Sequence, residues 1–414
     1  MILIIGAGLS GLTVANRLAH TRDILVLEKN DHPGGLSTSF YVDGFRFDYG
    51  GHYFHYDAHT RSVVKPYVEQ FGSFLEFERK SKTFLLRRYI PFPIQFHLAY
   101  LPFSLRKKIY QEMMETSEIS SANLAKYLDT HFGPTLVDLF FKPFLTKYYH
   151  TDLNALASNM DKGSIPIPDR AQVTAGYAGK RRIRAGYNPV LYYPKPSLKE
   201  WIDSYAKPVA NRIRFNESVV SIDTEQRKVT TTEGSYAYDQ LVTSMPLNTL
   251  LGILKPHGRF PSPHGLHCMS TLVVNVVLGR RNKRFHWVYL SEKTFPFYRV
   301  GLYAGQPFGV CYMERNLRPG SIPNSKKLHE DICYTLKELQ LITDPKEITH
   351  VEQRLIPAAY VVFDHRWETI VPAVLHQLKT HGIHSIGRYG AWNYSSMSQD
   401  IAQALQCAEE IKVR

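Results

Sequence analysis

The sequence predicts an α/β fold with a parallel sheet, into which a domain of helices and antiparallel strands is inserted. Three observations lead to this prediction. The chain opens with a short apolar run, Ile2–Ile5, which ends at a glycine-rich turn and is typical of a buried parallel strand. Short strand patterns return later in the chain, at residues 241–244 and 384–386. The long middle of the chain has different patterns, with helices and alternating strands.

The elements in chain order support a discontinuous organisation. Residues 9–19 predict a helix and residues 24–28 a second strand, which complete one βαβ unit with Ile2–Ile5. A stretch rich in proline and aromatic residues, at 88–102, introduces the middle of the chain. The further patterns predict helices at residues 104–115, 120–132 and 399–411, and strands at 212–223, 228–232 and 271–278.

These patterns give the expected domain boundaries. We expect the nucleotide-binding domain to comprise residues 1–75, 186–255 and 381–414. The inserted domain is expected to have a mainly helical cap at residues 76–185 and a substrate-binding sheet at residues 256–380.

Composition indicates a globular protein of two or three domains, since the 414 residues are 44% hydrophobic and 13% aromatic. The four cysteines are scattered, without the spacing of a metal site or a disulfide framework, which fits a reducing compartment. The apolar start has no charged region before it, so a secretory signal is not expected. With no long apolar stretch in the sequence, we expect a cytoplasmic protein without a transmembrane segment.

The net charge is +13, and basic residues cluster at 106–108, 180–184 and 280–284. Such a surplus is compatible with nucleic acid, an anionic membrane surface or phosphorylated small molecules. Each cluster is equally compatible with a solvated basic surface. Because no helix-turn-helix or ribonucleoprotein signature accompanies the clusters, a nucleic-acid partner is not expected.

A glycine motif between the first strand and the first helix predicts a nucleotide site of Rossmann type. The segment Gly6–Gly11 (GAGLSG) has the GxGxxG spacing, which provides a tight turn, close approach of backbone to a pyrophosphate, and close packing of helix on strand. The helix N-terminus then faces the phosphates. Glu28 ends the second strand, where its carboxylate is expected to accept from both ribose hydroxyls and to disfavour a 2′-phosphate.

Two further segments resemble a flavoprotein superfamily that includes amine oxidases, phytoene desaturases, protoporphyrinogen oxidase and UDP-galactopyranose mutase. They are residues 28–38 (EKNDHPGGLST) and residues 47–52 (FDYGGH). The resemblance implies FAD as the cofactor, with the Gly–Gly pair along its pyrophosphate and His52 beside the isoalloxazine. The cofactor residues implied by motif and resemblance are Gly6, Gly8, Ser10, Gly11, Glu28, Lys29, Gly35, Leu36, Gly51, His52, Val219, Gly387, Arg388 and Met397.

Later segments resemble the UDP-galactopyranose mutase branch in particular. They are residues 141–151 (FKPFLTKYYHT) followed by Leu156, residues 286–299 (HWVYL…FPFYR), Tyr360, and residues 385–394 (SIGRYGAWNY). The resemblance implies that Trp287 and Tyr289 line a sugar-nucleotide pocket and that Arg388 touches the flavin. It further implies that Arg299, Tyr360 and Tyr394 bind the diphosphate. His52, Arg299 and Tyr394 are the expected catalytic residues.

The residue types agree with that chemistry without the resemblance. Arginine presents a planar fork to phosphate oxygens, and tyrosine adds hydroxyl donors and stacking faces. Packing in an aromatic core is the alternative for Trp287, Phe295 and Phe297. Arg299 and Arg388 lie among apolar and aromatic residues, where an unpaired charge would be costly.

Three departures from the mutase pattern bear on the substrate. Ser164 stands where the branch has a second diphosphate arginine, for which Lys162 or Arg170 could substitute. The Gly–Gly pair that follows a Tyr-Pro in that branch is replaced in residues 192–197 (YYPKPS). The ending typical of amine oxidases is missing after Arg388. These departures favour a sugar other than UDP-galactose and disfavour an amine oxidase.

The expected function is interconversion of the pyranose and furanose forms of a nucleoside-diphosphate sugar. By resemblance, reduced FAD acts as the nucleophile at the anomeric carbon, with NADPH or NADH as candidate reductants. One alternative is an FAD-dependent oxidoreductase of the amine oxidase or desaturase type. Another is a flavin-bound protein without catalytic activity, whose basic surface recruits a partner.

Overall fold

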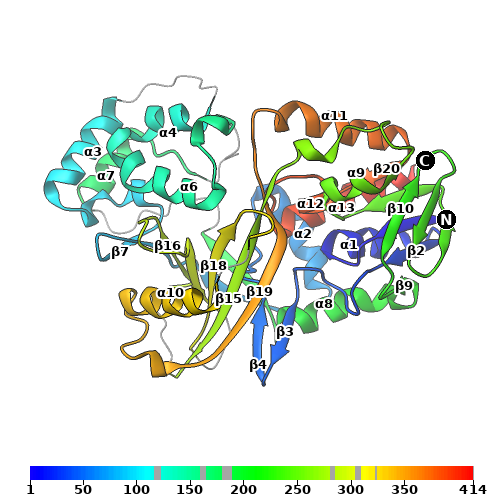
Figure 1. Ribbon diagram of the computed structural model, residues 1–414, viewed down its shortest axis with the longest axis horizontal. Coiled ribbons are helices and arrows are strands. Elements are labelled where there is room, and N and C mark those ends of the chain that lie inside the picture. Colours follow the sequence, from blue (N-terminus) through cyan, green and yellow to red (C-terminus); the bar gives the residue numbers. More distant parts are fainter. Residues whose placement is uncertain are drawn as a thin grey trace. The chain divides into compact units, whose positions relative to one another are not determined.

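The computed structural model describes residues 1–115, 123–158, 165–179, 189–279, 285–303, 309–321 and 324–413. The chain forms two compact units, each assembled from separate segments (Figure 1). Unit 1 comprises residues 1–77, 191–267 and 366–414, and unit 2 comprises residues 78–190 and 268–365. Ser164 and the basic clusters at 180–184 and 280–284 lie outside the described residues.

Unit 1 is built on a five-stranded sheet in the order β20 (Ile383–Ser385), β13 (Gln240–Thr243), β1 (Ile2–Ile5), β2 (Ile24–Leu27) and β9 (Ile213–Arg214). All four ladders are parallel. The central strand β1 is buried along its whole length, which explains its uninterrupted apolar sequence. The α/β fold class is confirmed.

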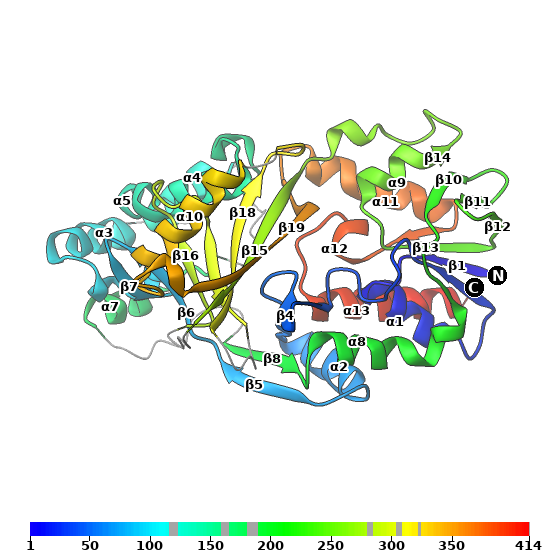
Figure 2. The ribbon, with the colours of Figure 1, turned by 60° about the horizontal axis from the view of Figure 1, so that its bottom comes forward.

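Four helices pack around one another in unit 1. The helix α1 (Leu9–Leu18) contacts both α13 (Met397–Lys412) and α8 (Leu198–Ala206), and α13 also contacts α2 (Ala58–Glu69) (Figure 2). An ion pair of 2.5 Å joins Arg17 on α1 to Glu409 on α13. The last helix of the chain is therefore held against the first.

The remaining elements of unit 1 are small sheets and short helices. A four-stranded sheet has the order β12-β11-β10-β14, β3 pairs with β4, and β5 pairs with β8. Their bounds are β3 (Ser39–Val42), β4 (Phe45–Asp48), β5 (Phe74–Glu78), β8 (Val190–Pro194), β10 (Val219–Asp223), β11 (Lys228–Thr231), β12 (Ser235–Ala237), β14 (Leu254–Lys255), α9 (Leu247–Ile253), α11 (Trp367–Thr380) and α12 (Gly387–Gly390).

Unit 2 contains a seven-stranded sheet in the order β19-β15-β18-β17-β16-β6-β7. The strands β16 and β6 run parallel, and the other neighbours are antiparallel. The bounds are β6 (Ser81–Leu85), β7 (Arg88–Pro91), β15 (Cys268–Leu278), β16 (Trp287–Leu290), β17 (Arg299–Leu302), β18 (Gly309–Leu317) and β19 (Ile348–Val361).

The two faces of this sheet differ in character because side chains alternate along a strand. One face carries Val288, Val300 and Met313, which are paired across neighbouring strands and belong to an apolar core shared with helix α10 (Ser325–Glu338). The opposite face carries the polar row of Tyr289, Arg299 and Glu314. The sheet therefore has an apolar side and a side suited to polar chemistry.

Helices make up the rest of unit 2. They are α3 (Phe103–Glu115), α4 (Leu124–Phe132), α5 (Pro134–Leu136), a π-helical turn (Val137–Phe141), α6 (Lys142–Tyr149) and α7 (Arg170–Tyr177), with short 3-10 turns that include η2 (Leu98–Tyr100). The helix predicted at residues 120–132 begins at Leu124, after the cap residue Asn123.

The unit boundaries agree with the predicted domain boundaries to within about five residues, except in two longer segments. Residues 256–267 and 366–380, which the sequence analysis assigned to the inserted domain, cluster with unit 1. The second of these segments forms most of α11, which packs against the sheet strand β20. None of the described helices combines the length and apolar character that crossing a bilayer requires.

Candidate functional site

The glycine motif forms a turn between β1 and α1, and its three glycines have different surroundings. A side chain on Gly11 would lie 1.9 Å from the carbonyl oxygen of Gly6, and one on Gly6, whose φ is +99°, would lie 2.4 Å from the Ser244 hydroxyl. In contrast, among the described residues no atom beyond the chain neighbours of Gly8 lies within 4 Å of the place where its side chain would stand. The first and last glycines are thus required by packing, and Gly8 leaves bare backbone at the start of the helix.

The Gly–Gly segment lies directly against this turn. The backbone N–H of Gly34 donates to the Ala7 carbonyl at 2.8 Å, and Gly34 forms a bridge with Gly8. A side chain on Gly35, whose φ is +58°, would lie 3.5 Å from the Gly8 Cα. Two glycine-containing backbone segments therefore meet at Gly8, where backbone without a side chain would allow a pyrophosphate to approach closely.

Glu28 is buried, and its carboxylate binds the protein itself. One oxygen accepts from the Ala7 N–H at 2.8 Å, and the other accepts from the backbone N–H and the side-chain amide of Asn30 at 2.9 and 2.8 Å. A carboxylate offers about four acceptor sites, so these bonds leave little capacity for ribose hydroxyls. Glu28 holds the glycine turn in place, and its ribose contact stays a prediction.

The end of the chain contributes to the same turn through Gly387. Its φ is +77°, and a side chain there would lie 2.4 Å from the Ser10 hydroxyl on α1. Its N–H donates to the Gln403 side chain on α13 at 2.7 Å. The sequence analysis missed Gln403, because a glutamine within an amphipathic helix gives no signal of such a contact.

Arg388 and Tyr394 form a pair beside Gly387. The Arg388 guanidinium lies 4.4 Å from the centre of the Tyr394 ring and donates to the Ser395 carbonyl at 2.8 Å. The Ser395 hydroxyl donates to Asp400, whose pKa burial raises to about 6. Tyr394 itself is 41% exposed. The predicted contact between these two segments and the cofactor stays a prediction.

The segment before His52 is anchored by a buried carboxylate. Asp48 accepts from the Ser39 hydroxyl at 2.6 Å and from the Tyr193 hydroxyl at 2.8 Å, and burial raises its pKa to about 6. His52 follows in an irregular, partly buried stretch. Asp48 and Tyr193 were not predicted as site residues, although both lie in segments compared with the flavoprotein pattern.

The structure thus connects most of the predicted glycine residues and Glu28 through direct contacts. The other predicted cofactor residues lie on further elements of unit 1. Lys29 follows β2 and is exposed, Leu36 follows the Gly–Gly pair, and Val219 begins β10. Gly51 precedes His52, and Met397 is buried at the first position of α13.

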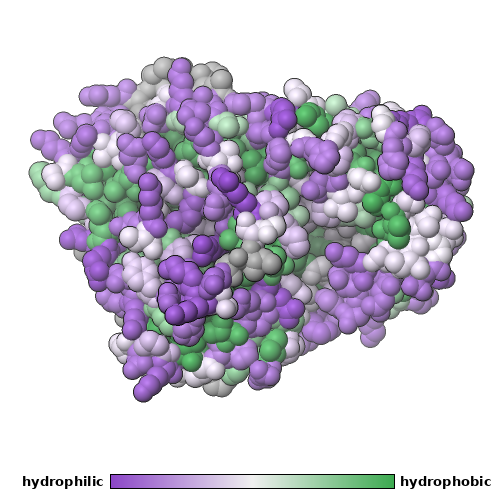
Figure 3. All heavy atoms as spheres, in the orientation of Figure 1, coloured by the Kyte–Doolittle hydropathy of each residue, from purple (hydrophilic) through white to green (hydrophobic). Residues whose placement is uncertain are grey.

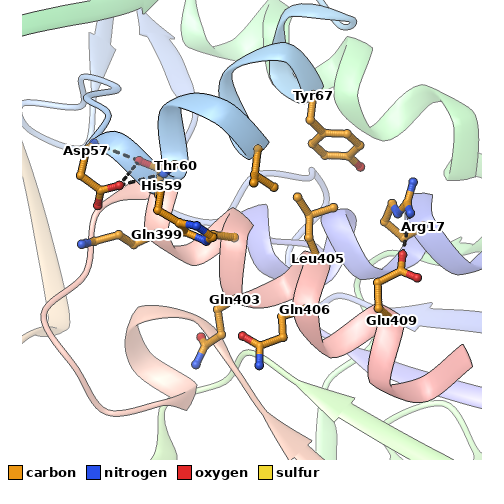
Figure 4. A pocket seen from close by; sticks show the side chains of 12 residues that line it. Arg17, Asp57, His59, Thr60, Tyr67, Gln399, Gln403, Leu405, Gln406 and Glu409 are labelled. Carbon is orange, nitrogen blue, oxygen red and sulfur yellow. Dashed lines mark hydrogen bonds and ion pairs between the residues drawn. The ribbon is translucent and has the colours of Figure 1, made fainter. Parts of the chain in front are cut away.

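A groove of about 840 Å³ runs between α2 and α13 in unit 1. Its wall is mixed, with the Arg17–Glu409 ion pair at one end and the Asp57 helix cap at the other (Figure 4). Gln403 lines this groove and also accepts from Gly387 N–H. The groove was not predicted from the sequence.

In unit 2, Arg299 lies on the polar face of the large sheet and is paired with a carboxylate. Its Nε and one terminal nitrogen donate to the two oxygens of Glu314, the second bond measuring 2.7 Å. That terminal nitrogen also lies 3.4 Å from the Tyr360 hydroxyl. Arg299 and Glu314 are both buried or nearly so, which explains why each needs the other. Glu314 was missed in the sequence, where it is a lone acid in an apolar strand.

Tyrosines surround this ion pair. The Tyr298 hydroxyl donates to the Tyr360 hydroxyl at 3.2 Å, and Tyr148 on α6 packs on both rings at 4.9 and 4.7 Å. Burial raises the pKa of Tyr289, and the positive charges of Arg299 and Arg79 oppose that rise. Tyr289 therefore stays a protonated donor at neutral pH.

A partly buried lysine fixes helix α6 to the sheet. The Lys147 ammonium donates to the carbonyls of Leu290 and Glu292 at 2.9 and 2.8 Å, and burial lowers its pKa to about 7. The same helix carries Phe144, whose ring lies 5.5 Å from that of Tyr289. Lys147 thus sets the position of the helix that packs on the tyrosine cluster.

The aromatic residues of the 286–299 block divide between the two faces. Phe295 and Phe297 are buried in the apolar core with α10, which confirms the core-packing alternative for both. Trp287 is 8% exposed and lies on the polar face, in register with Gly301. A side chain on Gly301 would overlap the Tyr312 ring, at 2.1 Å, so the glycine lets that ring lie across the strand.

The structure therefore brings Tyr289, Arg299 and Tyr360 close together in unit 2. His52, Arg388 and Tyr394 belong to unit 1. Of the proposed substitutes for a second diphosphate arginine, Lys162 lies outside the described residues, and Arg170 is exposed at the start of α7.

Comparison with known proteins identifies the family. The sequence profile of flavin containing amine oxidoreductases matches residues 9–302. A Klebsiella pneumoniae protein named "Probable UDP-galactopyranose mutase" is 25% identical over 171 residues, which cover 39% of this chain and 44% of that relative, less than half its length.

Two solved structures show the fold. A crystal structure of reduced UDP-galactopyranose mutase superposes with a TM-score of 0.90 at 22% identity, covering 100% of this chain and 93% of that one. A putrescine oxidase bound to putrescine gives a TM-score of 0.66 at 14% identity, covering 100% and 99%. The profile match spans well over half of the sequence, and the chain belongs to the flavin containing amine oxidoreductase family.

Proposed function

We propose that the chain is an FAD-dependent isomerase that interconverts the pyranose and furanose forms of a nucleoside-diphosphate sugar. The observation that carries the proposal is the group of Tyr289, Arg299 and Tyr360 on the polar face of the unit 2 sheet. The higher fold likeness to reduced UDP-galactopyranose mutase than to putrescine oxidase supports it.

The glycine turn fits FAD as the cofactor. Gly8 leaves open space against bare backbone, and Gly35 and Gly387 complete the turn with backbone conformations that favour glycine. Backbone N–H groups at the start of α1 would hold the pyrophosphate. Reduced FAD supplies an electron-rich centre for attack on a sugar carbon, so the protein needs no nucleophile of its own.

The residues of unit 2 would bind the diphosphate and keep it in place. Arg299 uses one edge of its guanidinium for Glu314, and its remaining N–H groups can donate to phosphate oxygens. The hydroxyls of Tyr289 and Tyr360 are further donors, and burial keeps Tyr289 protonated by raising its pKa. Because Glu314 offsets the charge of Arg299, tyrosine donors supply much of the recognition.

The departure at Ser164 bears on the choice of sugar. A site without a second arginine binds a diphosphate less strongly, so a substrate of the mutase type must gain affinity from its base or its sugar. We propose that UDP-galactopyranose is a poor substrate and that another nucleotide sugar is preferred. Ser164 lies outside the described residues, and the proposal depends on the sequence at that position.

An oxidoreductase is the second candidate, because the family that the profile identifies is one of flavin containing amine oxidoreductases. Such an enzyme begins its cycle with oxidised flavin and consumes an acceptor in each turnover. A flavoprotein without catalytic activity would neither isomerise a sugar nor consume an electron acceptor.

The redox state required for turnover separates these candidates. Purified holoprotein is reduced with dithionite, NADPH or NADH under nitrogen and incubated with a panel of nucleoside-diphosphate sugars, and pyranose and furanose forms are separated by chromatography. The isomerase should turn over many times per electron pair and only when reduced. Oxygen-dependent consumption of an amine or a polyene, without isomerisation of any sugar, would contradict the proposal.

A further inference from the structure

The helix α3 presents an unusual surface in unit 2. Its first residue, Phe103, is 63% exposed, and Tyr100 just before it on η2 is 36% exposed. Figure 3 shows hydrophobic side chains gathered at the left of the view, where Figure 1 places α3 and α7. Single exposed apolar residues are ordinary on protein surfaces, so the surroundings of Phe103 decide whether it belongs to a binding surface.

Those surroundings are basic. Residues 103–111 of α3 (FSLRKKIYQ) contain Arg106, Lys107 and Lys108 and no acidic residue. Lys107 lies one helical turn after Phe103, on the same side of the helix, and is exposed. The nearest acid in the sequence, Glu112, accepts from the backbone N–H and hydroxyl of Thr135 at 2.9 and 2.6 Å. It also forms a 3.9 Å ion pair with Lys108, whereas neither Arg106 nor Lys107 takes part in an ion pair with another described residue.

An aromatic ladder holds this surface rigid. The Arg106 guanidinium lies 5.3 Å from the ring centres of both Phe103 and Tyr177, and Tyr177 stacks on Tyr110 at 4.5 Å. Arg106 also donates to the Ala99 carbonyl at 3.4 Å. These contacts join α3 to α7 and fix the Phe103 ring at the surface, so that little side-chain entropy is lost when it inserts into another phase.

We propose that this surface, formed by Tyr100, Phe103, Arg106, Lys107 and Lys108, docks peripherally on an anionic lipid bilayer. Lysine heads would contact the lipid phosphates, and the aromatic rings would enter the interface, where tyrosine and phenylalanine are favoured. The chain's charge of +13 supports attraction to such a surface. The proposal is independent of the proposed function.

A membrane fits this surface better than a nucleic acid does. Single-stranded nucleic acid needs several exposed ring faces on which successive bases can stack. Here Tyr110 and Tyr177 already stack on each other, and the Arg106 guanidinium lies over Tyr177. Phe103 and Tyr100 remain exposed for insertion, which suits a shallow aromatic wedge.

Vesicle sedimentation tests the proposal with the full-length, flavin-loaded protein. Vesicles of phosphatidylcholine mixed with phosphatidylglycerol should bind it, and binding should weaken with added salt, whereas vesicles of phosphatidylcholine alone should not. The double substitution Lys107→Glu with Lys108→Glu should weaken binding by about 30-fold or more, since each lost cation accounts for about 5-fold. Phe103→Ser should weaken it by about 5- to 10-fold.

Matched controls come from α10 of the same unit. Lys326→Glu and Tyr334→Ser change an exposed lysine and an exposed tyrosine outside this surface, and both should bind as the wild type does. Circular dichroism spectra and thermal unfolding show that each variant is folded. Failure to bind anionic vesicles, equal binding to neutral vesicles, or equal losses in the α3 and α10 variants would overturn the proposal. So would binding of single-stranded DNA that depends on the same α3 residues in the absence of vesicle binding.

Discussion

Replacing Gly8 by alanine should release the flavin while leaving the fold of unit 1 nearly intact. Gly8 has φ −74° and ψ 179°, a conformation open to alanine, and in the described part of the chain nothing beyond its chain neighbours lies within 4 Å of the new methyl group. The methyl would instead stand between the backbone and a bound pyrophosphate. Losing one charge-assisted hydrogen bond corresponds to about 1.5–3 kcal/mol, so FAD should bind about 10- to 150-fold more weakly.

The matched control is Gly11→Ala, which should destabilise the fold of unit 1 more than Gly8→Ala does. Its methyl would lie 1.9 Å from the Gly6 carbonyl oxygen, so α1 must move away from β1. Overpacking of this kind costs about 1–3 kcal/mol or more. Gly8→Ala loses at most the glycine helix cap, which costs about 1 kcal/mol, and should lower the unfolding temperature by about 2–4 °C.

Two measurements on apoprotein separate these effects. FAD is titrated into each variant and followed by quenching of flavin fluorescence, and thermal unfolding without flavin is followed by circular dichroism. Flavin affinity of Gly8→Ala equal to the wild type would refute the idea that backbone at Gly8 approaches the pyrophosphate. An apoprotein of Gly8→Ala that is less stable than Gly11→Ala would refute the assignment of packing to Gly11.

Four further substitutions, one of them only in a double variant, test charged groups that are buried or partly buried. Burial raises the pKa of Asp48 from 3.8 to about 6, so between these pH values the folded state retains a proton that the unfolded chain has lost. The free energy of unfolding should therefore fall as pH rises through this range, by at most about 3 kcal/mol. Urea unfolding of apoprotein should show this fall in the wild type and a flatter profile in Asp48→Asn. Burial lowers the pKa of Lys147 from 10.5 to about 7, so stability should rise with pH above neutrality, and Lys147→Met should abolish the rise. Arg299→Ala should destabilise the protein by about 3–5 kcal/mol, because Glu314 stays buried without a partner. The double variant Arg299→Ala with Glu314→Ala should regain most of that stability but keep a raised KM for the nucleotide sugar. A KM equal to that of the wild type would contradict a role of Arg299 in substrate binding.

The parts of the fold that sequence reasoning predicted are those set by local backbone constraints. The strand β1, the glycine turn and α1 follow one another within the first eighteen residues, and each leaves a mark in its own segment. Gly8 and Gly11 could be assigned because a glycine spacing reflects what the backbone must do. The order of strands in the sheet of unit 1 was not predicted, since pairing of β13 and β20 depends on contacts far apart in the chain.

Contacts between distant segments explain most of what was missed. Gln403 meets Gly387 through helix packing, and residues 366–380 join unit 1 because α11 packs on β20, neither of which composition indicates. The buried partners of Asp48 are likewise remote, with Tyr193 on β8. A sequence shows that a carboxylate lies in an apolar context, but only the fold shows which hydroxyls satisfy it.

Arg299 shows how far a charge argument from sequence can go. Its apolar neighbours in the sequence indicated that the arginine charge needs an anionic partner, and the resemblance implied that a substrate diphosphate is that partner. The fold supplies Glu314 from the next strand instead, in direct register. A guanidinium paired in this way can be buried permanently, with or without a ligand, so its burial no longer requires a diphosphate. The terminal nitrogen that donates to Glu314 also lies 3.4 Å from the Tyr360 hydroxyl, which in turn accepts from the Tyr298 hydroxyl. Under the proposed function, a phosphate at this place would be bound by Arg299 together with the Tyr360 hydroxyl, and removal of that hydroxyl should weaken substrate binding without unfolding the sheet.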